Sequence, residues 1–83
     1  MKQSVYTVRD DVAETFCLPY VCMNDGVAVR AFYHGCKDPG SMISKSPGDY
    51  ALYVIGVFDD DTGVIVPEVP RMLVRGSVME QGE

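Results

Sequence analysis

The segment YALYVIGVFDDDTGVIV, residues 50–66, decides the fold of this chain. Strand-forming residues stand at both ends of the segment, and the polar stretch between them ends in Gly63, so the pattern predicts a β-hairpin. Both faces of the first strand are apolar, with Leu52, Val54 and Phe58 on one face and Tyr53, Ile55 and Val57 on the other. We therefore expect a strand that is covered on both sides.

Shorter strands are expected on either side of this hairpin. Alternation of side chains predicts a first strand over Ser4–Arg9. The segment Val12–Met23 contains Pro19, which blocks a helix, so we expect an irregular connection with a short extended piece at residues 20–22. After the hairpin, prolines interrupt the pairing and Arg71–Arg75 forms a final edge strand.

One helix is predicted between the first strand and the hairpin. Asn24 and Asp25 are good N-cap residues, and the helix should cover Val27–Lys37. A loop rich in Ser, Gly and Pro follows over Asp38–Gly48. The helix face expected to pack on the sheet comprises Ala28, Ala31, Phe32 and Gly35. The predicted fold class is α+β: a small antiparallel sheet of three to five strands, with one helix packed on a face through Ala28 and Phe32.

The length of 83 residues predicts a single domain over residues 1–83, with a tail that frays from about residue 78. A domain of this size buries only about 60–65% of the surface of its unfolded chain, so a homodimer would add stability. The first residues lack the apolar core of a signal peptide, and no run approaches the roughly 20 apolar residues of a membrane span. We therefore expect a cytoplasmic protein.

Metal and catalytic sites are not expected. Three cysteines favour reduced thiols over a disulfide framework. Cys17, Cys22, His34 and Cys36 are zinc ligands by type, but their spacings are not those of zinc fingers. Asp59–Asp61 resembles the start of a calcium loop, yet a strand follows at once, so a turn is the better interpretation. No nucleophile has a recognisable base and orienting group, and we expect neither a cofactor nor enzymatic activity.

One predicted surface carries a binding argument. Arg30, His34 and Lys37 share the outer face of the helix beside Tyr33, where cations can follow a phosphate backbone and an aromatic ring can stack on an unpaired base. Such a stripe is also typical of an ordinary solvated helix face. Tyrosines at positions 6, 20, 50 and 53 are either further stacking platforms or core residues. The candidate nucleic-acid-binding residues are Arg30, Tyr33, His34, Lys37, Arg71 and Arg75.

The net charge of −5 is concentrated in two places. Five of the twelve acidic residues lie in the hairpin turn and the tail, and the other 12 − 5 = 7 balance the seven Lys and Arg residues. The acidic turn and the apolar strand before it suit a partner protein. The alternative to DNA contact is therefore a protein-interaction module whose candidate partner-binding residues are Asp59, Asp60 and Asp61.

Four segments and Asp10 carry a resemblance to a known family: VYTV (5–8), AVRAF (28–32), SPGDY (46–50) and LYVIGVFDDDTG (52–63). In their order, these pieces resemble the small nonstructural protein of gokushoviruses, the tail-less single-stranded DNA phages of the microvirus group. The hairpin is the most specific part of the resemblance. The three cysteines and the acidic tail depart from the family pattern.

The resemblance implies a phage protein that is made in the host bacterial cytoplasm and is absent from the mature capsid. It implies a nonenzymatic accessory role in synthesis or packaging of the single-stranded genome, and no catalytic motif is carried over. Arg30 matches a family position. Single-stranded DNA is therefore the first expected partner, and the alternative is an interaction module that regulates the viral replication initiator or a host factor without touching DNA.

Overall fold

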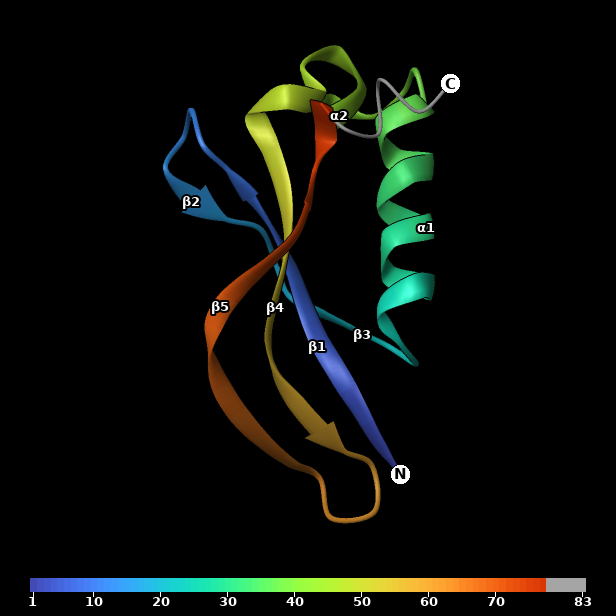
Figure 1. Ribbon diagram of the computed structural model, residues 1–83, viewed down its shortest axis with the longest axis vertical. Coiled ribbons are helices and arrows are strands. Elements are labelled where there is room, and N and C mark those ends of the chain that lie inside the picture. The colour runs from blue at the N-terminus through green and yellow to red at the C-terminus, as the bar shows by residue number, and fades with distance from the viewer. Residues whose placement is uncertain (78–83) are drawn as a thin grey trace.

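Five strands form one antiparallel sheet, and one long helix packs on it (Figure 1). The computed structural model describes residues 1–77, so the predicted fraying of the tail from about residue 78 lies outside the described residues. The elements in chain order are β1 Lys2–Asp10, β2 Thr15–Phe16, β3 Tyr20–Cys22, α1 Asp25–Lys37, α2 Met42–Lys45, a 3₁₀ turn at Pro47–Asp49, β4 Tyr50–Asp59 and β5 Val64–Arg75. The predicted α+β fold class is confirmed.

The sheet is built around β4, which pairs with β1 on one side and with β5 on the other. β2 and β3 both pair with the far edge of β1, β2 at Arg9–Asp10 and β3 at Ser4–Tyr6. Within residues 1–77, β5 pairs with β4 alone, so its other side is a long free edge. The extended piece predicted at residues 20–22 is confirmed as β3.

The predicted hairpin of β4 and β5 is confirmed, and its turn follows from the residues within it. The Gly63 N–H donates to the Asp59 carbonyl at 2.8 Å, and the Asp59 side chain accepts from the Asp61 N–H at 2.9 Å. Gly63 has a φ of 77°, in the left-handed region that glycine adopts without strain.

One face of β4 is better covered than the other, although Phe58 at the end of that face is half-buried. Leu52 and Val54 are buried in the core. The residues expected on the other side stay half-buried: Tyr53, Ile55 and Val57. The expectation of full cover on both faces is therefore wrong, because the long helix packs on just one of them.

β5 is one strand, so the expectation of a separate final strand at residues 71–75 is wrong. The prolines do interrupt the pairing, as expected. The register between β4 and β5 skips residues 68–70, which bulge between Pro67 and Arg71. A proline at an edge removes a hydrogen-bond donor without ending the extended backbone.

β2 was not predicted, and its position follows from a tight reversal after β1. The Asp10 side chain accepts from the N–H groups of Val12 and Ala13 at 3.0 and 3.1 Å. Glu14 then adopts a positive φ of 57°. The chain returns along β1 and brings Phe16 against Arg9 in the register of the pair.

The loop expected over Asp38–Gly48 is more ordered than predicted. It contains α2, whose N-cap Ser41 accepts from the Ile43 N–H at 3.1 Å. Ile43 packs against the core, while Met42 is exposed. Serine at a cap position explains a short helix where composition alone indicated a loop.

α1 begins earlier than predicted, because Asn24 is its cap. The Asn24 side chain accepts from the Val27 N–H at 2.9 Å, which satisfies one of the donors that a helix start leaves open. The helix ends at Lys37, as predicted, and the Asp38 N–H donates to the His34 carbonyl at 2.9 Å.

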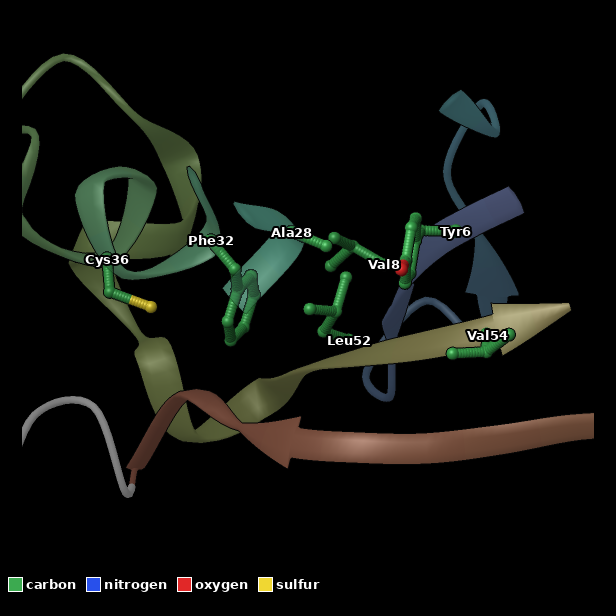
Figure 2. Close-up of a cluster of buried hydrophobic side chains, with 7 residues drawn as sticks. All are labelled: Tyr6, Val8, Ala28, Phe32, Cys36, Leu52 and Val54. Atoms are coloured by element: carbon green, nitrogen blue, oxygen red, sulfur yellow. The ribbon is translucent and has the colours of Figure 1, made fainter. Parts of the chain in front are cut away.

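The buried face of α1 consists of residues one turn apart. Ala28, Phe32 and Cys36 are buried, and Figure 2 shows them in one cluster with Leu52 of β4. Ala31, which was expected on this face, is exposed instead. The spacing i, i+4, i+8 places these three side chains in a narrow row on one face of the helix. Packing through Ala28 and Phe32 is as predicted.

Tyr6 fastens the start of α1 to the sheet. Its side chain is fully buried, and its hydroxyl donates to the Asp25 carboxylate at 2.6 Å. Burial, followed by this hydrogen bond, raises the pKa of Tyr6 to about 12. A buried phenol with a charged acceptor is both a packing and a polar contact.

Replacing Phe32 by Ala should lower the free energy of unfolding by about 3–5 kcal/mol, because the side chain is 3% exposed in a small core. Urea denaturation followed by circular dichroism measures this change. His34→Ala, on the exposed side of the same helix, should change stability little. Equal effects of the two substitutions would contradict the packing of α1.

Tyr6→Phe should lower the free energy of unfolding by about 1–2 kcal/mol at neutral pH, because it removes a hydrogen bond to a carboxylate. The folded pKa lies above the unfolded value of about 10, so the phenol's contribution is present below pH 10 and is lost as the pH rises toward 12. Urea denaturation across this pH range should show that the free energy of unfolding falls less steeply with pH in the variant than in wild type. An unchanged decline would contradict the assigned pKa.

Candidate nucleic-acid interface

The predicted basic surface forms on the side of α1 that faces away from the core. Arg30 and His34 are exposed, and Tyr33 and Lys37 are half-buried. The Lys37 ammonium lies 5.7 Å from the centroid of the Tyr33 ring, and the Tyr33 and His34 rings are 5.9 Å apart. We call these four residues the helix stripe.

Charged residues stand at the two ends of α1, where they interact favourably with the helix dipole. Its acidic residue, Asp25, is in the first turn, and His34 and Lys37 are in the last turn. Cations near the C-terminal end of a helix interact favourably with its carbonyl groups, so this distribution stabilises the helix by itself. The helix sequence from Arg30 to Lys37 itself contains no acidic residue.

Arg71 and Arg75 lie on β5, apart from the helix stripe. Arg71 is exposed. Arg75 is half-buried, and its guanidinium donates to the Asp11 carboxylate at 2.6 Å and to the Gly48 carbonyl at 3.3 Å. The structure therefore divides the six candidate residues into a group of four and a group of two, and the charge of Arg75 is already paired.

Asp11 joins two strands that are far apart in sequence. One of its oxygens accepts from Arg75 of β5, and the other accepts from the Arg9 Nε of β1 at 3.0 Å. The bonds from Arg75 and then from Arg9 lower the pKa of Asp11. The three side chains together carry one positive charge.

An aromatic and arginine cluster lies beside this ion pair. The Arg9 guanidinium carbon is 5.3 Å from the centroid of the Phe16 ring. Phe16 meets Tyr53 edge to face, with 5.5 Å between centroids and 81° between planes. Tyr53 was among the tyrosines considered as stacking platforms, but Phe16 was not considered. The signal that was available is a Thr-Phe pair following two turn-forming aspartates.

The other tyrosines considered as platforms belong mainly to the core. Tyr6 is fully buried. Tyr20 and Tyr50 are half-buried and pack against the core cluster, and burial raises the pKa of each. Among the described residues, the aromatic rings that are not fully buried and lie outside the core cluster are those of Phe16, Tyr33, Tyr53 and Phe58.

The acidic turn is occupied by its own contacts. The Met1 ammonium donates to Asp60 and to Asp61, each at 2.8 Å. These bonds, Asp60 first, raise the pKa of the amino group and lower that of Asp60. Asp59–Asp61 is the one cluster of three potential metal-ligand side chains within residues 1–77, and its hydrogen bonds are those of a turn.

The three cysteines differ in exposure. All of them are thiols; Cys17 is exposed, Cys22 is half-buried and Cys36 is buried in the core. Reduced thiols are as predicted: Cys36 is a core residue, Cys22 packs against the core, and Cys17 is exposed.

The fold and these surfaces define a small α+β protein, in which no helix among the described residues is long and apolar enough to cross a bilayer. The chain belongs to the Phage ORF5 protein family, whose model matches residues 3–79. It is therefore a phage protein, as the sequence resemblance implied. No curated protein matches the chain, and no solved structure does.

Replacing Asp11 by Asn should lower the unfolding temperature slightly at neutral pH and low salt, because Arg9 and Arg75 lose their shared acceptor. Asp11 has a lowered folded pKa, so its contribution is present above the unfolded value of about 3.9 and is lost as the pH falls through the folded one. Calorimetry should therefore show that the difference in unfolding temperature between wild type and Asp11→Asn disappears in acid. Glu68→Gln, on exposed β5, is the control; a difference that persists in acid would contradict the ion pair.

Proposed function

We propose that this chain is a nonenzymatic accessory protein of viral single-stranded DNA synthesis or packaging in gokushoviruses, and that it contacts the DNA in the host cytoplasm. Its membership of a phage family supports a viral role, and the similarity of its segments to the gokushovirus protein supports the more specific assignment. The observation that carries direct contact is the helix stripe.

The helix stripe has the chemistry that a single strand requires. Arg30 and Lys37 are seven residues apart, about 10 Å along the helix axis. Over that length a nucleic-acid strand presents more than one phosphate. Tyr33 lies between them and offers a ring on which an unpaired base stacks. His34 is exposed next to that ring, and its imidazole N–H can donate to a phosphate oxygen.

The three carboxylates of the acidic turn do not oppose this contact, because the turn is remote from it. Figure 1 shows the hairpin turn at one end of the molecule and the C-terminal end of α1, which carries Lys37, at the other. The molecule is 39 Å long. Screening at physiological salt acts over about 8 Å, so the two charged regions are independent.

The second candidate function is a protein-interaction module that regulates the viral replication initiator or a host factor without DNA contact. The hairpin end favours it, because exposed apolar residues stand beside the three aspartates. Val64, Ile65 and Val66 are 53, 60 and 57% exposed. An apolar patch bordered by charge is typical of a surface that a partner covers.

Fluorescence anisotropy with a labelled oligothymidylate tests the DNA proposal. Contacts from Arg30, Lys37 and Arg71 predict that the logarithm of the binding constant falls with the logarithm of salt with a slope of about −2. Arg30→Ala should weaken binding and make the slope shallower by about 0.7. Lys2→Ala removes the same charge from the hairpin end and should leave both values unchanged.

The two functions predict opposite rankings of variants. If the module binds a protein, charge reversal at Asp59–Asp61 should weaken capture of the viral replication initiator while Arg30→Ala has little effect. If it binds DNA, Arg30→Ala should have the larger effect, and nuclease should abolish any capture. Absence of oligonucleotide binding even at low salt would contradict the DNA proposal.

A further inference from the structure

The cluster around Phe16 is a second basic and aromatic surface, on the side of the sheet away from α1. In Figure 1, β2 and α1 lie on opposite sides of β1. Phe16 is 41% exposed, although an aromatic ring gains most from burial. The helix stripe accounts for none of these residues, so the cluster needs a separate explanation.

A hollow of about 330 Å³ lies against the Phe16 ring. Its volume is at the lower end of the range for small-ligand pockets, which suits one planar ring rather than a folded segment. The Thr7 hydroxyl in its wall already donates to the Cys17 carbonyl at 2.7 Å. The residues that line the hollow are Thr7, Phe16, Cys17, Pro19, Ile55 and Pro70.

The Phe16 ring is held in place before any ligand binds. The turn at Asp10 and Glu14 sets the return of the chain, and the Cys17 N–H donates to the Val8 carbonyl at 2.8 Å. Tyr53 supports one edge of the ring. Preorganisation of this kind reduces the entropy that a ligand loses on binding.

Positive charge borders the ring. Arg9 lies over it, and Arg75 is bound to the same carboxylate as Arg9, so this trio retains one net positive charge. The acidic turn begins at Asp59, six residues along β4 from Tyr53, which is about 20 Å. That separation exceeds the screening length, so the hairpin turn does not cancel the charge of the arginines. The nearer carboxylates are those of Glu14 and Asp10 at the turn before β2, and the Asp10 carboxylate accepts from the Val12 and Ala13 N–H groups.

From this geometry we propose that the hollow beside Phe16 is a stacking site for one unpaired base of a single-stranded DNA, with Arg9 next to the adjoining phosphate. This site rests on the proposed function, since it assumes that the protein binds single strands. It adds a base-reading surface to the helix stripe, so that the strand contacts both sides of the sheet. Aromatic rings bordered by arginine are the usual construction of such sites.

A base suits the hollow better than an extended peptide does. A peptide that adds to a sheet needs a regular edge of hydrogen-bonding groups. β5 is the free edge here, but Pro67 and Pro70 lack N–H groups and residues 68–70 bulge out of register. An apolar side chain would fill the hollow without using Arg9, whereas a nucleotide uses both the ring and the cation.

Two probes separate base stacking from phosphate contact: a fluorescein-labelled oligothymidylate and an abasic strand of equal length. Phe16→Ala and Phe16→Leu should each weaken oligothymidylate binding about 5- to 150-fold, the range for loss of one stacked base. Leu retains apolar packing, so it removes the ring while preserving the fold. Both variants should bind the abasic strand as wild type does. Phe16→Tyr keeps an aromatic ring and should therefore bind the oligothymidylate as wild type does.

Leu18→Ala is the matched control, because Leu18 is 89% exposed, two residues from Phe16, and does not line the hollow. It should bind both strands as wild type does. Wild-type affinity of Phe16→Leu for oligothymidylate would overturn the stacking site, while the effect of Arg30→Ala would still support the proposed function. If wild type bound neither strand, both the stacking site and the proposed function would be contradicted. A change of elution volume in Phe16→Leu without a change of affinity would overturn the site in favour of a protein interface.

Discussion

A single long helix has to cover a five-stranded sheet, and this constraint shapes every surface of the molecule. α1 packs on the sheet through its buried face, which consists of Ala28, Phe32 and Cys36. Nine hydrophobic residues of the described chain are buried, whereas twelve large ones are exposed. The core is therefore small, and a few contacts such as Phe32 and the Tyr6 hydrogen bond hold the helix in place. Apolar residues that the helix does not reach form the hollow at Phe16 and the exposed hairpin end.

The acidic turn and the basic surfaces are held apart by the sheet. Three carboxylates gather at the hairpin turn, while Arg30 and Lys37 lie on α1, and Arg9 and Arg75 share the Asp11 carboxylate at the other end of the sheet. The ten residues of β4 connect the acidic turn to the opposite end of the sheet, a distance several times the screening length. Net charge is consequently a poor guide to what this protein binds, because each surface presents its own local field.

The two longest elements were predictable from different signals. α1 has a clear helical period, whereas the hairpin was predictable from its β-branched and aromatic residues. Asn24 and Gly63 mark where they begin or turn. β2 has only two residues, too few for a period, and its turn uses Glu14 at positive φ in place of glycine. Arg75 looked available because its partner, Asp11, is 64 residues away. The helix stripe was readable from helical spacing, whereas the cluster at Phe16 exists only once β2 has folded back.

The uneven exposure of the three cysteines has a practical consequence for anyone who labels this protein. Cys17 is the exposed one and lies in the wall of the hollow, whereas Cys36 is inside the core. A thiol-reactive dye would therefore attach first beside Phe16, where its emission depends on whether water or another molecule fills the hollow. The same position is the first to be modified when thiols are oxidised, so purification in air would alter this surface before it altered the fold.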